Sequence, residues 1–87
     1  TVFVHFVDVT DFTTTVKVNG VVKCVLGKGE YGFGEVYLPT DANAKYVVEV
    51  DFSDRDRLVG TYESSFHTSR EPSAVQFILT PDKIRRY

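Results

Sequence analysis

The residues best suited to recognise a ligand are aromatic. Tyr31, Phe33 and Tyr37 have the same parity, so in a β-strand their side chains lie on one face. Exposed rings of this kind can stack on a sugar or pack against a protein partner. The alternative is that Phe33 belongs to the core and the tyrosines line the sheet edge. Tyr62 completes the predicted ligand-binding set, although the absence of tryptophan weighs against a carbohydrate site.

A group of aspartates is the best candidate for a metal site. The predicted calcium cluster is Asp51, Asp54 and Asp56, with Asp8 or Asp11 as a further ligand. Calcium prefers clustered carboxylate oxygens. However, Arg55 and Arg57 alternate with these acids and can neutralise them, and the EF-hand pattern is absent. A solvated charged turn is therefore the favoured interpretation, and we predict no cofactor.

Nucleophilic catalysis has weak candidates. Ser64 and Ser65 lie close to His67 in sequence, but no Gly-x-Ser-x-Gly elbow surrounds them. His5 sits in an apolar segment, as a core or edge histidine does. Cys24 is the only cysteine, so it forms no internal disulfide and is expected to act as a small buried hydrophobe. Two histidines and one cysteine without short spacing do not make a zinc site. We predict that the protein is not an enzyme.

The composition predicts one small domain spanning residues 1–87. A net charge of −2 argues against a general nucleic-acid binder and against a polybasic membrane-surface role. No apolar run reaches the roughly 18 residues of a membrane-spanning helix. Lys83, Arg85 and Arg86 are typical of a solvated end, with an acidic partner as the alternative. Because Thr1 opens inside an apparent strand without a preceding Met, we expect a processed product or a fragment.

Alternating apolar residues predict a series of β-strands. The expected segments are Thr1–Val9, Thr13–Leu26 divided at Asn19-Gly20, Glu30–Leu38, Tyr46–Ser53, Leu58–Phe66 and Ser73–Thr80. About seven strands with frequent turn signals predict an all-β fold, a single antiparallel β-sandwich. The inward residues of the two clearest strands are Tyr46, Val48, Val50 and Phe52, and then Val75, Phe77 and Leu79.

Three details of pairing follow from the pattern. Both faces of the first strand are apolar, which predicts a place near the centre of a sheet. The same strand lacks a polar residue at its start, so pairing of its edge with another chain is the alternative. For the Asn19-Gly20 hairpin we prefer a three-residue loop, which sets Val16 opposite Val22, over a two-residue turn. We also predict a bulge at Gly34.

Two families resemble parts of the chain. A β-sandwich domain of bacterial surface proteins, of unknown function, resembles Val2–Val9, Val16–Gly20, Tyr37–Pro39 and Tyr46–Val50. Transthyretin-like domains, related in architecture to immunoglobulin-like ones, resemble Tyr46–Asp51, Phe66-His67 and Val75–Phe77. Both resemblances imply an extracellular-type sandwich that binds a partner or acts as a spacer. No hydrolase residue carries over.

These observations favour a non-enzymatic interaction or structural module within a larger secreted or surface protein. Its partner would be a protein, and the alternative is a module that binds a carbohydrate or another small ligand.

Overall fold

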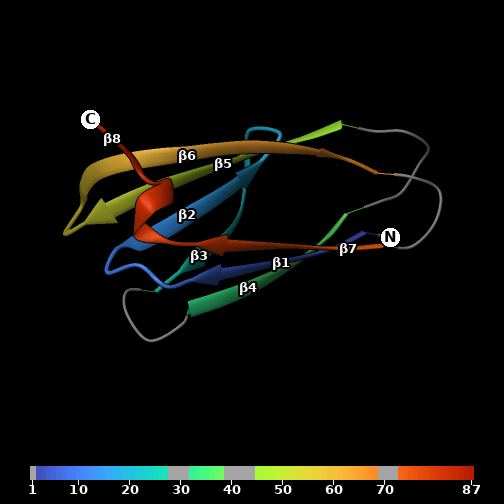
Figure 1. The fold of residues 1–87 in the computed structure, drawn as a ribbon, viewed down its shortest axis with the longest axis horizontal. Coiled ribbons are helices and arrows are strands. Elements are labelled where there is room, and N and C mark those ends of the chain that lie inside the picture. Colours follow the sequence, from blue (N-terminus) through green and yellow to red (C-terminus); the bar gives the residue numbers. More distant parts are fainter. Residues whose placement is uncertain (1, 28–31, 39–44, 69–72) are drawn as a thin grey trace.

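The chain folds into two β-sheets. The computed structural model describes residues 2–27, 32–38, 45–68 and 73–87. Its elements are β1 (Val2–Asp8), β2 (Thr13–Val18), β3 (Val21–Leu26), β4 (Gly32–Leu38), β5 (Lys45–Asp54), β6 (Arg57–His67), β7 (Ser73–Leu79), the 3₁₀ turn η1 (Pro81–Lys83) and β8 (Arg85–Arg86). The sheet orders are β4-β1-β7 and β3-β2-β5-β6-β8. The two sheets form separate layers (Figure 1), so the predicted all-β, sandwich-like class is confirmed.

One core lies between the layers because alternate residues of each strand point inward. The buried hydrophobic residues are Val2, Val4, Phe6, Val16, Val18, Leu26, Val36, Val48, Val50, Phe52, Phe77, Leu79 and Ile84. Most of the predicted inward residues of β5 and β7 are therefore confirmed, with Tyr46 and Val75 only partly buried. Complete burial of one such valine or phenylalanine stabilises the fold by about 1.5–3 kcal/mol.

Strand β1 occupies the centre of the three-stranded sheet, as its two apolar faces predicted. It pairs antiparallel with β4 and parallel with β7, so Phe6 lies opposite both Gly34 and Phe77. The alternative that β1 offers an edge to another chain is wrong, because β4 and β7 take up both of its hydrogen-bonding sides. The purely antiparallel sandwich is also wrong at the β1–β7 pair. Parallel strands need a long connection, and these two strands lie near opposite ends of the chain.

The β2–β3 hairpin differs from the predicted register. Asn19 and Gly20 both have positive φ, 50° and 81°, and Val18 pairs with Val21 across a two-residue turn. This turn matches the twist of the strands better than the three-residue loop that we predicted. A bulge at Lys23 then shifts the register, so Val16 faces Cys24. Because the two-residue turn pairs Val22 with Lys17, Val22 is 52% exposed instead of sharing the core face.

The predicted bulge at Gly34 is wrong. The β1–β4 ladder runs without a shift from Val2 opposite Leu38 to Asp8 opposite Gly32. A second bulge occurs instead in the β5–β6 pair, where Phe52 faces Gly60 and Ser53 faces Leu58. Val59 is the extra residue of that bulge.

A buried carboxylate organises the connection from β1 to β2, which crosses between the sheets. Asp8 is 0% exposed, and its Oδ1 accepts hydrogen bonds from the Thr10 backbone N–H at 2.8 Å and from the Thr10 hydroxyl at 2.6 Å. The Thr14 hydroxyl donates to Oδ2 at 3.5 Å. The Phe12 backbone N–H in turn donates to Thr10 Oγ1 at 3.2 Å. We call Asp8, Thr10 and Thr14 the Asp8 cluster, and it sets the position of Phe12.

Replacement of Asp8 tests this cluster. Asp8→Ala is expected to lower the free energy of unfolding by about 3 kcal/mol, because it leaves buried donors of Thr10 and Thr14 without an acceptor. Asp8→Asn keeps one acceptor oxygen and is expected to lose less. Urea unfolding of the three proteins measures the difference. Equal stability of Asp8→Ala and the wild type would contradict a structural role for the cluster.

Candidate functional site

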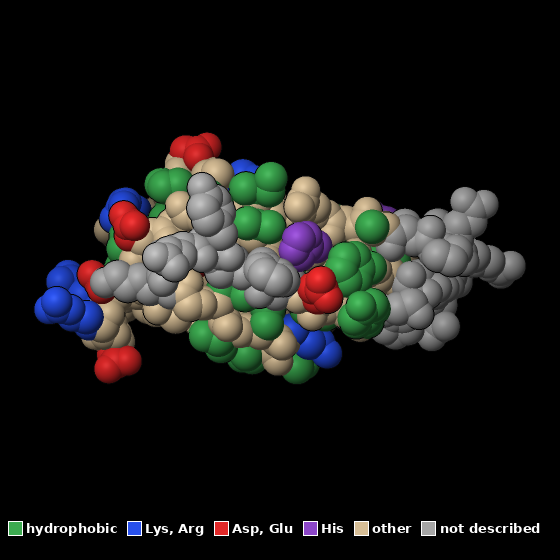
Figure 2. Space-filling model, turned by 90° about the horizontal axis from the view of Figure 1, so that it is seen from below, with side chains coloured by type: hydrophobic (Ala, Val, Ile, Leu, Met, Phe, Trp, Pro, Cys, Tyr) green, Lys and Arg blue, Asp and Glu red, His purple; other side chains and the backbone are tan. Residues whose placement is uncertain are grey.

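The outer side of the three-stranded sheet carries a patch of apolar and aromatic side chains. We call it the aromatic face, and its members are Phe3, His5, Val7, Glu35, Tyr37, Ala74, Gln76 and Ile78. The strand register arranges them in rows across the sheet, with Phe3 opposite both Tyr37 and Ala74. Figure 2 shows the molecule from this side, where hydrophobic side chains lie around a histidine and an acidic side chain. Sequence reasoning missed Phe3, although the two apolar faces of β1 carried the signal.

The row formed by Tyr37, Phe3 and Ala74 is apolar and contains one contact between rings. The Phe3 and Tyr37 ring centroids are 5.2 Å apart, with the rings inclined at 52°. Phe3 is half-buried and Tyr37 is 65% exposed. The exposed phenol is therefore supported by a neighbouring ring, which limits the side-chain freedom that Tyr37 loses when it binds a partner.

The middle row is polar. His5 lies opposite Glu35 on one side and Gln76 on the other. Gln76 Nε2 is 3.4 Å from His5 Nδ1, and the Phe3 ring is stacked 6.1 Å from the imidazole. Imidazole, carboxylate and amide groups together offer donors and acceptors to a partner that covers the face.

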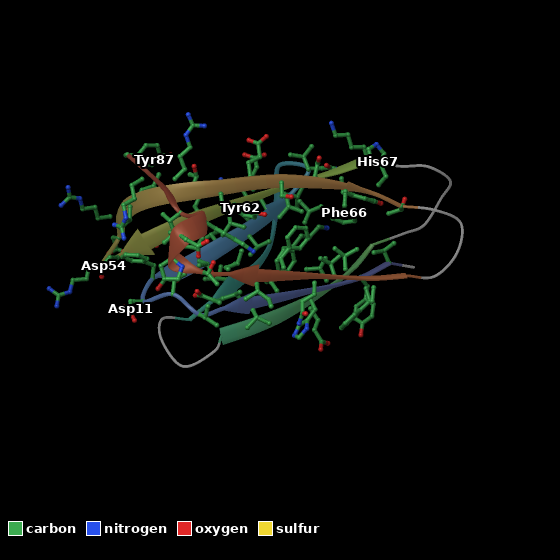
Figure 3. The ribbon with its side chains drawn as sticks, in the orientation of Figure 1. Asp11, Asp54, Tyr62, Phe66, His67 and Tyr87 are labelled. Carbon is green, nitrogen blue, oxygen red and sulfur yellow. The ribbon has the colours of Figure 1, made fainter. Side chains whose placement is uncertain are left out.

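The structure places the other predicted binding residues only in part. Tyr62 is on β6 in the other sheet, where it packs against the core, and Lys83 Nζ is 5.9 Å from its ring centroid. Figure 3 shows Tyr62 between the two layers. Tyr31 lies outside the described residues, and Phe33 is placed only by its backbone register opposite Val7. The structure therefore does not bring Tyr62 together with Tyr37.

The residues considered for catalysis are also dispersed. His67 and Ser65 are exposed on β6, whereas His5 lies on the opposite sheet. Ser64 has the other parity on β6 and lies opposite the buried Val48. Cys24 is half-buried against the core, and this burial raises the pKa of its thiol and keeps it protonated.

The aspartates do not converge on a metal position. Asp51 forms an ion pair with Lys17 at 3.0 Å, and the Asp8 carboxylate is held inside its cluster. Asp56 is exposed in the β5–β6 turn with a φ of 66°. Within the described ranges, no three carboxylate, histidine or cysteine side chains come close enough to hold a metal ion.

A recess lies at the end of the molecule where β5 turns into β6. We call it the end hollow; it has a volume of about 390 Å³ and is lined by Phe12, Asp54, Arg57, Leu58, Val59, Arg86 and Tyr87. The Arg86 guanidinium lies over the Phe12 ring, 5.4 Å from its centroid. Figure 3 shows Asp54 and Tyr87 at this end of the sheets. Sequence reasoning had noted Arg86 only as part of a basic tail.

Gly60 allows β8 to close one side of the hollow. A Cβ atom at Gly60 would lie 2.6 Å from the Arg85 carbonyl oxygen and 2.7 Å from Ile84 Cγ2, so a side chain does not fit there. Gly60 pairs with Arg86, and the Tyr87 N–H donates to the carbonyl of the bulged residue Val59 at 3.3 Å. The close approach at Gly60 and the Val59 bulge thus hold Arg86 over Phe12.

No family model matches the chain, and neither a curated protein nor a solved structure matches it. The part of the chain that the structure describes contains no helix with the length and apolar character needed to cross a bilayer.

Substitution of Gly60 tests the packing of β8. Gly60→Ala is expected to displace β8 and to destabilise the fold by about 1–3 kcal/mol, since the added methyl group overlaps backbone atoms. Amide hydrogen exchange measures the result. The Tyr87 amide is expected to lose protection, whereas the protection of β1 amides is expected to change only as much as the free energy of global unfolding does. Gly27→Ala is the control for loss of a glycine, because a Cβ atom there would meet nothing within 4 Å and the backbone is not left-handed. Unchanged protection at Tyr87 in Gly60→Ala would contradict the contact.

The Lys17–Asp51 pair predicts a pH dependence. Hydrogen bonding to Asp51 raises the pKa of Lys17 above 10.5. The stabilisation from this pair is therefore complete below pH 10.5 and is lost as the pH rises through the raised pKa. Titration of the Lys17 side chain by NMR is expected to show a lower pKa in Asp51→Asn than in the wild type. An identical midpoint in both proteins would rule out the pair in solution.

Proposed function

We propose that this domain is a non-enzymatic interaction module that docks a protein partner on the aromatic face. The observation that carries the proposal is the exposed Tyr37 ring on the edge strand β4, supported by Phe3 on the neighbouring central strand β1. Tyrosine is enriched among the residues that dominate binding energy, because it offers a large rigid surface and a polar group. Ile78, which is 44% exposed, extends the apolar area along β7.

The polar middle row of the aromatic face sets a requirement on the partner, which must carry hydrogen-bonding groups of its own. A partner that covers His5, Glu35 and Gln76 must provide matching hydrogen bonds, since polar groups left unpaired on burial reduce affinity. Apolar side chains lie on both sides of this row. We therefore expect a partner surface with apolar contacts flanking a few polar ones.

The setting of the module is part of the same proposal. Its resemblance to surface-protein and transthyretin-like sandwiches supports a place within a larger secreted or surface protein. In an immunoglobulin constant domain the first strand shares a sheet with the second, fourth and fifth. Here β1 shares its sheet with β4 and β7, which supports the transthyretin-like variant over the immunoglobulin-like one.

The second candidate function is binding of a carbohydrate or another small ligand on the same face. It is favoured by one observation, the 65% exposure of the Tyr37 ring, because an exposed ring can stack on a sugar. The protein-docking proposal is preferred because the rows extend across three strands, which gives a surface and not a pocket.

Variants of the face separate these functions. Proteins that co-purify with the full chain from its source cells are tested individually against the wild type, Tyr37→Ser and Ile78→Ser, with Val25→Ser, at an exposed position on β3 of the other sheet, as the control. We expect Tyr37→Ser to weaken a true partner at least about tenfold, because truncation of an aromatic residue that dominates binding energy has an effect of this size. We expect Val25→Ser to have no effect.

A glycan panel followed by tyrosine fluorescence tests the alternative. Saturable glycan binding that depends on Tyr37 would replace the protein proposal with the carbohydrate one. Partners that bind all four proteins equally would show that the aromatic face is not the docking site.

A further inference from the structure

The end hollow combines a positive side with an apolar side. Arg57 and Arg86 line it together with one acidic side chain, Asp54, so guanidinium groups outnumber carboxylate side chains by two to one. Phe12, Leu58, Val59 and Tyr87 supply the apolar side. Its volume of about 390 Å³ is within the range of small-molecule sites, about 300–1,000 Å³.

The stacking of Arg86 on Phe12 prepares the guanidinium for an anion. A guanidinium 5.4 Å from a ring centroid gains a cation–π interaction, while the N–H groups at its edge can still donate. Those donors have the planar fork geometry that matches the two oxygens of a carboxylate. Arg57 adds a second positive charge to the same lining.

The position of these groups is set before any ligand arrives. Phe12 is held through Thr10 by the Asp8 cluster, and Arg86 is held by the close approach of β8 to Gly60. Two segments far apart in sequence, residues 8–12 and 84–87, thus meet at one place. Such prior ordering reduces the entropy cost of binding.

From this geometry we propose that the end hollow binds a small carboxylate with an aromatic or aliphatic body. The carboxylate pairs with Arg86 and Arg57, and the body covers Leu58, which is 46% exposed, and Val59. Inorganic phosphate fits less well, because it would leave the apolar side uncovered. This site is independent of the aromatic face, since it lies at the end of the sheets among different residues.

The test uses the full chain labelled with ¹⁵N and titrated with 3-phenylpropionate. We expect saturable shifts at the backbone amides of Leu58, Val59 and Arg86. The neutral 3-phenylpropionamide is expected to bind at least about tenfold more weakly, since it lacks the charge that strengthens the hydrogen bonds to arginine.

Two matched variants test whether the Arg86 guanidinium binds the carboxylate. Arg86→Gln is expected to weaken 3-phenylpropionate about tenfold. The control is Arg85→Gln, which removes the same charge from the neighbouring residue of β8, where the side chain points to the other face and is absent from the lining. A control that weakens binding as much as Arg86→Gln would mean a diffuse charge effect and would overturn the site.

Two further outcomes overturn the proposal without any variant. Equal affinity for the acid and the amide would show that the arginines do not select the ligand. Inorganic phosphate that shifts the same amides with the affinity of 3-phenylpropionate would show a general anion contact. Neither outcome bears on the aromatic face, so failure here leaves the docking proposal to its own test.

Discussion

The double pairing of β1, with β4 on one side and β7 on the other, is the interaction on which the rest of the structure depends. It joins strands from the two ends and the middle of the chain in one sheet. Its inward residues Val2, Val4 and Phe6 are completely buried, so β1 anchors that layer of the core. Its outward residues Phe3 and His5 become the centre of the aromatic face. Core and candidate docking surface are therefore two sides of one strand.

The connection from β1 to β2 contributes Phe12 to the second candidate site, the end hollow. Thr10 in this connection is buried, so its backbone and hydroxyl groups need hydrogen-bond partners within the protein. Asp8 meets this need for Thr10 and, through it, orders Phe12. Near the C-terminus, β8 packs so closely against Gly60 that no side chain would fit at position 60. The end hollow exists because these two constraints act at the same end of the sheets.

The two β-bulges have different structural consequences. The bulge at Lys23 returns Cys24 to the side of Val16 after a tight turn that would otherwise bring Lys23 there. The bulge at Val59 frees a carbonyl group for Tyr87. One bulge preserves the core and the other positions a binding group, although both insert a single residue into a ladder.

Alternation of apolar residues along the chain was enough to determine the all-β class, the positions of the main strands and the inward set Val48, Val50 and Phe52. That information is local, since side chains of one parity share a face whatever the partner strand is. Tertiary structure alone decided the register of the hairpin, the parallel β1–β7 pair, and the separation of Tyr62 from Tyr37. It also brought Arg86 to Phe12. Each of these depends on contacts between residues distant in sequence, where partners are chosen by packing and by hydrogen bonds that no short pattern encodes.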